Sequence, residues 1–451
     1  MQPEPPPGVP TTAPRPDAEG VGLRRRLRRS ARPPLRVVRS VAFALLRAQG
    51  RRHRADLRSA ADRVSFLLLD AFAMGGTNRT VFTLAGHLAR TRDVALISVL
   101  QTAPAPFFAV PAGVRLIALD KQGRTPLQRL LARAPSLLWN DADTAFPSVS
   151  LWTDIQLVRT LRALPPGVVI GTRPGLNILL ARLRPAHLLT VGQQHLALDG
   201  HHPALRAEIA RAYRHLDGFA VLGRDDERDL EPLLAGAPTR LVRIPNALPD
   251  LGPPRTPDLD TRVAVGLGRL TDQKGFDRLL PAFAQVVAQR PDWVLRIYGD
   301  GPEREALESQ AVDLGLERHV QLMGASRDVS ADLARASLFV LSSRTEGFPM
   351  VLLEAMAAGL PVVSFACPHG PDEILTDGED GLLVPDGDID ALAAAVLRLV
   401  DDPAQRAALS RRARQTVARY GLDEIGGRWE SFLDGLGARR AAGVPVDEAA
   451  R

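Results

Sequence analysis

Short apolar runs alternate with amphipathic segments along most of this chain, beginning at Val64. In the first half, each run ends at a turn and leads into a segment with helical spacing, although residues 121–150 lack a regular pattern. The strand candidates are residues 64–69, 94–100, 114–119, 168–171, 188–191, 219–222 and 241–244. Buried parallel strands are typically continuous apolar runs separated by helices. The pattern therefore predicts a doubly wound, Rossmann-like α/β domain over residues 64–250.

A proline-rich stretch interrupts this alternation, which then restarts. Residues 248–257 hold four prolines and a glycine, as is typical of a linker. The later strand candidates are residues 263–268, 293–298, 320–323, 338–341, 361–365 and 381–384. We therefore expect a linker at residues 251–261 and a second Rossmann-like domain at residues 262–420. Ligands of open parallel sheets bind at the carboxyl ends of the strands, so a site is expected in the cleft between the domains.

The two ends of the chain differ from the body in composition. Residues 1–63 hold 15 arginines and 5 acidic residues, a net charge of +10, whereas the whole chain is +6. This basic, proline-rich leader is expected to be largely disordered. Its segment 35–46 suits either a short helix on an anionic membrane or a tail with no partner. Residues 421–451 are expected to form a helix returning to the first domain, followed by a frayed tail.

Overall composition narrows the class of protein. A length of 451 residues suggests two or three domains, and 45% apolar residues indicate a globular chain. The single cysteine, Cys367, excludes an internal disulfide and fits a reducing compartment. No apolar run reaches the roughly 20 residues that a membrane-spanning helix needs. We expect a cytoplasmic protein, with peripheral contact at the inner face of the plasma membrane if the leader binds anionic lipid.

Two carboxylates flank a predicted helix start in residues 346–354. Glu346 lies on the loop, and Glu354 lies in an apolar helix that ends near Gly359. The turn between them consists of Gly347, Phe348, Pro349 and Met350. Pro349 suits the first helical position, and the free backbone amides around it would attract phosphate. Carboxylates beside an anion are favourable only where they face hydroxyls, so the segment predicts a ligand with both phosphates and sugars.

A cationic loop follows the strand candidate at 263–268. Gly268 ends that strand, and Arg269 and Lys274 lie five positions apart on the loop. Of the 57 basic residues only Lys121 and Lys274 are lysines, so a lysine here is unusual for this chain. Two cations at the carboxyl end of a strand suit a diphosphate, with a solvated pair of loop charges as the alternative.

Together these segments resemble the retaining glycosyltransferases of family 4, which have the GT-B fold. The resemblance covers roughly residues 64–435, and four motifs in the family's order carry it. They are Gly268-Arg-Leu with Gln273-Lys-Gly, Tyr298-Gly-Asp-Gly-Pro, residues 343–361, and Cys367-Pro-His-Gly-Pro-Asp-Glu-Ile. In that family the counterpart of Glu354 holds the nucleotide ribose and that of Glu346 faces the transferred sugar. The positions of Arg269 and Lys274 grip the diphosphate.

The resemblance extends to two places in the first domain. Gly75 and Gly76 end the first strand, and the family has a similar glycine pair near the diphosphate and acceptor. A plain tight turn is the alternative reading of this pair, and Arg79 departs little from the family pattern. His195 follows a later strand, and in related enzymes a histidine hereabouts approaches hydroxyls of the donor sugar. A structural histidine is the alternative.

Two further segments are candidate donor contacts. Residues 368–374 follow a strand and open a helix, so amides near Gly370 and the side chain of Glu373 could bind the donor sugar. Relatives with this motif often transfer hexoses or N-acetylhexosamines to cell-surface glycans. They commonly have an aspartate where this chain has Ala366, which weakens any inference about the sugar. Gly299 is placed near the nucleotide base by position alone.

Neither a metal nor a cofactor is expected. Asp141 and Asp143 imitate an Asp-x-Asp metal motif, but they lie in an irregular stretch far from the donor motifs. His201 and His202 follow His195 without a carboxylate at ligand spacing. A metal-independent enzyme would stabilise its leaving group through cationic side chains and helix amides.

We therefore expect a retaining transfer from a nucleotide sugar to a hydroxyl of a glycan or lipid-linked acceptor. The donor expected is a UDP-hexose or UDP-N-acetylhexosamine, used in cell-surface polysaccharide synthesis. A sugar-nucleotide epimerase with the same fold is the main alternative. A dinucleotide oxidoreductase is disfavoured because no G-x-G-x-x-G follows the first strand. A nucleic-acid-binding protein is ranked low, since the leader lacks interleaved aromatics and the body is acidic, so no nucleic-acid partner is expected.

Overall fold

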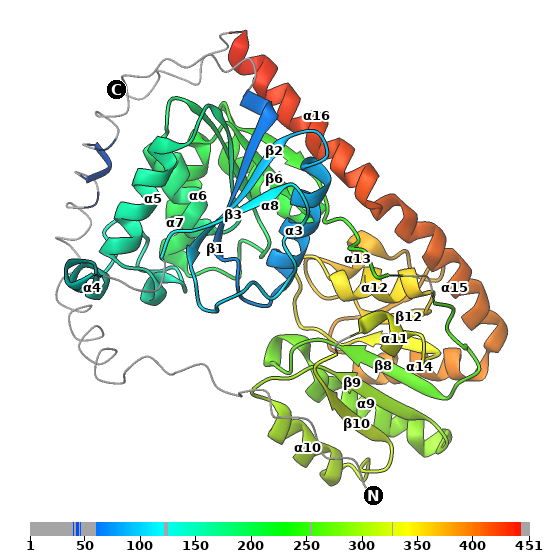
Figure 1. Ribbon diagram of the computed structural model, residues 1–451. Helices are drawn as coiled ribbons and strands as arrows, with labels where there is room; N and C mark the ends of the chain where they lie inside the picture. Colours follow the sequence, from blue (N-terminus) through cyan, green and yellow to red (C-terminus); the bar gives the residue numbers. More distant parts are fainter. Residues whose placement is uncertain are drawn as a thin grey trace, which may run out of the picture.

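The computed structural model describes residues 39, 42–44, 46, 60–120, 125–252, 255–326 and 328–442. Within these residues the chain forms two parallel β-sheets, each flanked by helices (Figure 1). The C-terminal helices α15 (Pro403–Val417) and α16 (Leu422–Ala441) run along one side of both halves. The predicted α/β class with two doubly wound sheets is confirmed.

The first sheet has seven strands in the order β3-β2-β1-β4-β5-β6-β7, and all neighbours are parallel. The strands are β1 (Arg63–Asp70), β2 (Asp93–Leu100), β3 (Val114–Ala118), β4 (Gly167–Gly171), β5 (Leu188–Gln193), β6 (Gly218–Val221) and β7 (Arg240–Arg243). The α-helices of this half are α3 (Gly76–Leu88), α4 (Pro126–Arg133), α5 (Leu151–Ala163), α6 (Pro174–Leu183), α7 (Pro203–Ala212) and α8 (Arg224–Leu234).

The second sheet has six parallel strands in the order β10-β9-β8-β11-β12-β13. The strands are β8 (Val263–Leu267), β9 (Val294–Tyr298), β10 (Val320–Gly324), β11 (Leu338–Leu341), β12 (Val362–Phe365) and β13 (Leu382–Val384). The helices around it are η4 (Asp272–Lys274), α9 (Phe276–Gln289), α10 (Arg304–Asp313), α11 (Val329–Leu333), α12 (Met350–Ala358), α13 (Pro371–Ile374) and α14 (Ile389–Asp401).

The strands are apolar on both faces because helices cover both sides of each sheet. In β1, Phe66 and Leu68 pack into one core cluster, whereas Leu67 packs into the cluster on the opposite face. All three side chains are at most 1% exposed. This two-sided burial explains why the sequence shows continuous apolar runs rather than alternation with polar residues.

Helix α16 closes one face of the first sheet. Its buried residues Ile425, Trp429, Phe432 and Leu436 recur at three- or four-residue spacing, which places them on one helical face. The helix approaches β6 so closely that a Cβ atom at Gly218 would lie 2.7 Å from the Phe432 ring. The last helix is therefore built into the core of the first half, although it follows the second half in sequence.

Strand order also determines where loops can face a ligand. β1 lies next to β4, and β8 lies next to β11, so the chain changes direction across each sheet at these pairs. Crevices form outside the carboxyl ends of strands at such switch points. The loop after β1 carries Gly75, and the loops after β8 and β11 carry Lys274 and Glu346.

Most of the leader lies outside the described residues, as do residues 443–451. The expectations of a disordered leader, a membrane-bound basic segment and a frayed tail therefore stay predictions. Phe43 is an exception because it is fully buried in the first domain, with the Arg182 guanidinium 5.3 Å from its ring centre. At this position, the apolar side chain of the leader packs on the protein itself.

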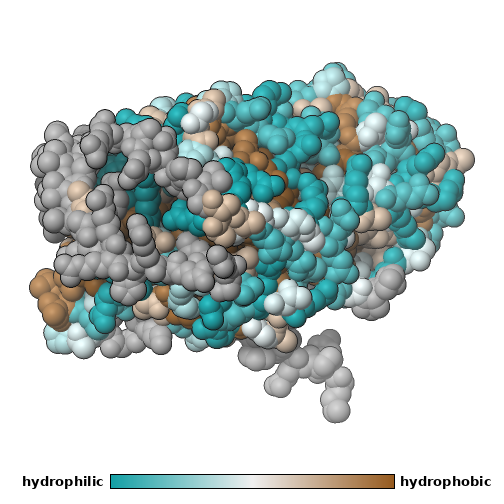
Figure 2. Space-filling view, turned by 90° about the horizontal axis from the view of Figure 1, so that it is seen from above, coloured by the Kyte–Doolittle hydropathy of each residue, from teal (hydrophilic) through white to brown (hydrophobic). Residues whose placement is uncertain are grey.

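The face of the molecule seen in Figure 2 is largely polar. Hydrophilic residues cover most of the view in Figure 2, with hydrophobic residues in separate areas. Among the described helices, none combines the length and the apolar character needed to cross a membrane.

Candidate active site

An ion pair joins the loops that follow β8 and β11. The Nζ atom of Lys274 lies 2.6 Å from Oε1 of Glu346, and the Ser343 hydroxyl donates to the same oxygen at 2.6 Å. Glu346 is only 6% exposed. Because β8 and β11 are neighbours in the sheet, two segments about seventy residues apart converge on one carboxylate.

Glu354 lies in α12, one turn from its N-terminus, and is 2% exposed. A guanidinium nitrogen of Arg79, from the first turn of α3, donates to its Oε1 atom. Burial raises the pKa of the Glu354 carboxyl, whereas the charges of Arg79 and Lys274 lower it. The second glutamate is thus paired with a cation from the opposite domain.

The start of α12 differs by one residue from the prediction. Pro349 is the N-cap residue rather than the first helical residue, and the helix begins at Met350. No side chain among the described residues caps this end of the helix. Gly359 ends the helix with a φ of 86°, in the left-handed region that favours glycine.

Three contacts show that the carboxyl ends of the two sheets face each other. Besides the Arg79–Glu354 pair, Gly347 packs against the backbone after β5, since a Cβ atom there would lie 2.3 Å from the His195 carbonyl oxygen. Arg224, at the start of α8, donates through Nε to Glu373 Oε1 at 3.2 Å. Predicted site residues of both domains therefore meet at the junction between the two sheets.

His195 lies two residues beyond β5. Its buried Nε2 atom has no hydrogen-bond partner among the described residues. Burial lowers the pKa of the imidazole to about 4, so the ring is neutral at physiological pH. A neutral imidazole can accept a hydrogen bond from a sugar hydroxyl or donate one to it, whereas an imidazolium can only donate.

The glycines of the site fall into two groups. A Cβ atom at Gly75 or Gly76 would meet nothing within 4 Å, so this backbone is open to close approach by a ligand. In contrast, Gly299 has a φ of 151°, and a Cβ atom there would overlap the Gly268 carbonyl oxygen at 1.8 Å. Packing between β8 and β9 therefore explains Gly299 without a nucleotide base.

Gly370 and Phe348 support the turn before α12. A Cβ atom at Gly370 would lie 2.7 Å from Pro349 Cδ and 3.1 Å from Glu346 Cβ. The Phe348 ring is 7% exposed and packs 5.9 Å from the Tyr420 ring. These contacts fix the backbone that carries Glu346.

Arg269 is the member of the predicted cationic pair that stands apart. Its side chain is exposed and has no hydrogen-bond or ion-pair partner among the described residues. Lys274, by contrast, covers Gly268 and reaches Glu346. Of the four charged groups predicted to converge, Lys274, Glu346 and Glu354 therefore lie near one another.

Some partners in this cleft carried no sequence signal. Arg224 and the pairing of Arg79 depend on the way the two sheets face each other, which no local pattern encodes. Ser343 differs, because it lies three residues before Glu346 on the same loop. Asp143 accepts hydrogen bonds from the Ala145 amide at 2.9 Å and from Arg173 at 2.7 Å. Both reach Oδ1, so one oxygen of this segment, which resembles an Asp-x-Asp metal motif, already has protein partners. Among the described residues no group of three or more His, Cys, Asp or Glu side chains could hold a metal ion.

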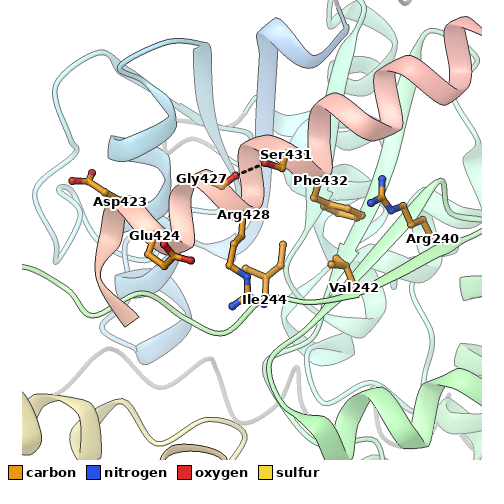
Figure 3. Close-up of a pocket in the computed structure, with 9 residues that line it drawn as sticks. All are labelled: Arg240, Val242, Ile244, Asp423, Glu424, Gly427, Arg428, Ser431 and Phe432. Carbon is orange, nitrogen blue, oxygen red and sulfur yellow. Dashed lines mark hydrogen bonds between the residues drawn. The ribbon is translucent and has the colours of Figure 1, made fainter. Parts of the chain in front are cut away.

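A separate pocket lies outside the cleft. It measures about 490 Å³ and lies between β7 and α16, as Figure 3 shows. The Arg240 guanidinium lies 5.7 Å from the Phe432 ring centre at one end of it. None of the predicted site residues lines this pocket.

Comparisons with known proteins agree with this geometry. Residues 253–416 match the family model of group 1 glycosyl transferases. Over 261 residues the chain is 36% identical to the lipopolysaccharide core biosynthesis glycosyltransferase LpsD of Rhizobium meliloti, covering 57% of this chain and 72% of that protein. This chain belongs to the group 1 glycosyltransferases.

A second relative is similar over most of this chain. Over 392 residues the glycosyltransferase is 36% identical to an exopolysaccharide phosphotransferase of Streptomyces coelicolor, covering 84% of this chain and 41% of that protein. The chain thus spans less than half of that relative.

Solved structures share the architecture. S. aureus TarM superposes with a TM-score of 0.67 at 14% identity, covering 82% of this chain and 99% of that one. Sucrose-phosphate synthase of Thermosynechococcus elongatus gives 0.69 at 21% identity, covering 84% and 99%. The GT-B prediction is confirmed.

Proposed function

We propose that this glycosyltransferase moves a sugar, with retention of configuration, from a nucleotide sugar to a hydroxyl of a glycan or lipid-linked acceptor. The proposed donor is a UDP-hexose or UDP-N-acetylhexosamine, and the proposed setting is cell-surface polysaccharide synthesis at the cytoplasmic side of the membrane. The convergence of Lys274, Glu346 and Glu354 at the interdomain cleft carries the proposal.

The names of relatives support the setting. LpsD is named for lipopolysaccharide core synthesis, and a Bacillus subtilis relative, 28% identical over 171 residues, is a poly(glycerol-phosphate) alpha-glucosyltransferase. The TarM structure contains UDP and alpha-GlcNAc-glycerol. The Streptomyces relative is named as a phosphotransferase, but most of that protein has no counterpart in this chain, so we do not propose that activity here.

Departure of a nucleoside diphosphate leaves two negative charges to be stabilised. In this proposal Lys274 stabilises these charges, and the exposed Arg269 side chain can rotate toward the diphosphate. The N-terminus of α12 adds a smaller stabilisation. Preorganised donors at such a site contribute about 3–4 kcal/mol, whereas a helix terminus contributes roughly 0.3–2 kcal/mol. The cations therefore dominate in this proposal, and neither a metal nor another cofactor is invoked.

The remaining residues bind and orient the donor. Glu354 accepts hydrogen bonds from the ribose hydroxyls, Glu346 faces the sugar, and neutral His195 contacts a sugar hydroxyl. Attack on the face from which the diphosphate leaves requires no protein nucleophile. Closure of the cleft would exclude water and limit hydrolysis of the donor.

A thermal-shift screen tests the donor first. UDP, GDP and ADP are each added to the full chain, since a ligand that binds the native state raises the melting temperature. GDP belongs in the panel because a Mycolicibacterium smegmatis relative, 37% identical over 193 residues, is named as GDP-mannose-dependent. Stabilisation by UDP is expected, and no response to any of the three would contradict the proposal.

A transfer assay then separates the enzyme classes. The matching nucleotide sugar is incubated with and without a glycan acceptor. A transferase makes a glycosylated product and releases the nucleotide efficiently only when an acceptor is present. An epimerase makes a new nucleotide sugar without an acceptor. Conversion of the donor to an isomeric nucleotide sugar in the absence of acceptor would overturn the proposal.

A further inference from the structure

One cation in the cleft has no place in the proposed chemistry. Arg79 is the fourth residue of α3, directly after the open glycine pair of the first domain. Its guanidinium donates to Glu354, on α12 of the second domain. The side chain of Arg79 is 29% exposed, whereas that of Glu354 is 3% exposed.

This inference rests on the proposed function, in which Glu354 accepts the two ribose hydroxyls. We propose that Arg79 is a positioning residue that substitutes for those hydroxyls before the nucleotide binds. It holds the Glu354 carboxylate ionised and oriented, and it yields its place to the ribose when the nucleotide enters.

The chemistry of the two partners is matched. An ionised carboxylate only accepts hydrogen bonds, and both a guanidinium and a vicinal diol present neighbouring donors to it. A buried carboxylate without such partners is strongly disfavoured in its charged form. Before a diol binds, the buried carboxylate therefore needs another donor to stay ionised.

Other charges near Glu354 cannot take over this role. Arg79 and Lys274 are the charged groups that act on its carboxyl, one from α3 and one from η4. Lys274 is already committed to Glu346 at 2.6 Å. Arg79 is thus the described residue that donates a hydrogen bond to Glu354.

The exposure of Arg79 explains how it can leave. Its side chain is partly in solvent, so the guanidinium can withdraw into water without a large desolvation penalty. Glu354 cannot move with it, because its helix packs in the core beside Leu353 and Ala355, both fully buried. The exchange therefore changes the partner and leaves the carboxylate in place.

Removing Arg79 should have two opposite effects on nucleotide binding. Without the competing guanidinium, an ionised Glu354 is free to bind the diol, which strengthens binding at alkaline pH. Burial already raises the pKa of Glu354, and loss of Arg79 removes a charge that lowers it. A protonated carboxyl cannot accept both hydroxyls, so affinity should fall as the pH falls through that raised value.

The experiment measures binding of UDP, or of whichever nucleoside diphosphate stabilises the wild-type chain, by calorimetry between about pH 5.5 and pH 8.5. For the wild type we expect little change in Kd over this range. For Arg79→Ala we expect Kd at the alkaline end to equal or improve on the wild type. At the acid end we expect a rise of about tenfold, since one proton competes with the ligand.

Further variants assign the effect. Arg79→Lys keeps a cation and should restore a flat profile, whereas Arg79→Gln should behave like Arg79→Ala if the alanine variant folds poorly. In Arg79→Ala combined with Glu354→Gln, the pH dependence should vanish. A 2′,3′-dideoxynucleoside diphosphate, which lacks the diol, should bind Arg79→Ala without the acid-side loss. Arg90→Ala is the control, because Arg90 forms an exposed ion pair with Asp423 at 2.7 Å.

The outcomes separate the two proposals. If the wild type binds no nucleoside diphosphate, the proposed function fails and this inference fails with it. If the wild type binds and the Arg79→Ala profile runs parallel to it, or if Arg79→Lys also loses affinity at acid pH, only the role of Arg79 is overturned.

Discussion

Lys274 and Glu346 neutralise each other across adjacent strands of the second sheet, with Nζ 2.6 Å from Oε1. The side chains are 16% and 7% exposed, so the pair is largely withdrawn from water. In the proposed reaction the diphosphate must draw Lys274 away from this carboxylate, which then becomes free to face the sugar. One ion pair thus links the phosphate and sugar halves of the site.

Replacing Lys274 with alanine should therefore reduce sugar transfer far more than it reduces stability. Loss of one preorganised donor to a developing anion reduces kcat by about 10²–10³-fold. Glu346 keeps the Ser343 hydroxyl, which limits the damage to the fold. Initial rates with saturating donor provide the measurement, with a melting curve beside them.

The matched control for that variant is Arg290→Ala. Arg290 is at the C-terminal end of α9, which Lys274 precedes, and its guanidinium forms a surface pair with Asp401 at 2.7 Å. Its removal should leave turnover unchanged, since exposed pairs contribute only about 0–1 kcal/mol. Turnover by Lys274→Ala at the wild-type rate would refute the phosphate role.

Alanine at Gly347 should loosen the junction between the two domains. The added Cβ atom would lie 2.3 Å from the His195 carbonyl oxygen. The backbone fixes the positions of both atoms, so no side-chain rotation can relieve the overlap. Overpacking of this kind typically costs about 1–3 kcal/mol, and a shift of the catalytic loop can lower turnover about 10²-fold. Thermal melts and initial rates measure the two effects.

Gly427→Ala tests whether that result is specific to the junction. Gly427 lies inside α16, and a Cβ atom there would meet nothing within 4 Å. Alanine in a helix interior is favoured over glycine by up to about 1 kcal/mol, so this variant should be as stable as the wild type or more so. Equal behaviour of both variants would mean that the contact between Gly347 and His195 does not matter.

The alternation of apolar runs and helical segments was sufficient to predict two parallel sheets, because strands covered on both faces need continuous apolar sequence. One helix was not predicted, although the sequence contains a local signal for its start. Helix α4 lies in the stretch without regular pattern, yet Thr125 and Gln128 form a capping box and Pro126 occupies the first turn. That combination is a recognised start of a helix.

Contacts between the two domains could not be predicted from the sequence. Arg79 and Glu354 are 275 positions apart, and their pairing depends on how the domains are set against each other. Sequence patterns report faces of single elements, so they could place Glu354 in a helix but could not show its contact with Arg79. Gly299 is a different case, since its tight approach to the Gly268 backbone already accounts for a glycine at this position, and its contact with the nucleotide base stays a prediction.

The single cysteine should be inert in the native protein. Cys367 is 2% exposed, and burial, together with the nearby Glu346 charge, raises the pKa of its thiol to about 12. Only a minute fraction is therefore thiolate at pH 8, the form that attacks disulfide reagents. Labelling with Ellman's reagent should be slow in buffer and reach one thiol per chain in denaturant. Rapid labelling of the folded chain would show that the segment around Cys367 opens readily.

Stability should depend on pH through His369, which bridges the two domains. Its Nδ1 atom lies 3.5 Å from Asp226 Oδ1 and its Nε2 atom 3.8 Å from Asp199 Oδ1. Contact with Asp226 raises the pKa of the imidazole above its ordinary value of 6.5. A raised folded-state pKa stabilises the protein fully below the unfolded value, and this contribution is lost as the pH rises through the folded value. The melting temperature of the wild type should accordingly carry an added decline from about pH 6 to pH 8.5.

Asparagine is the informative replacement at this position. His369 has a φ of 60°, in the left-handed region that asparagine tolerates better than most residues, so His369→Asn removes the charge with little backbone strain. The variant should lose the added decline, and the difference between the two curves should be about 1 kcal/mol or less. His202→Asn is the control, because His202 is exposed and caps α7, a role that asparagine also fills. If His369→Asn and the wild type show the same slope, the interdomain contact does not depend on protonation of His369.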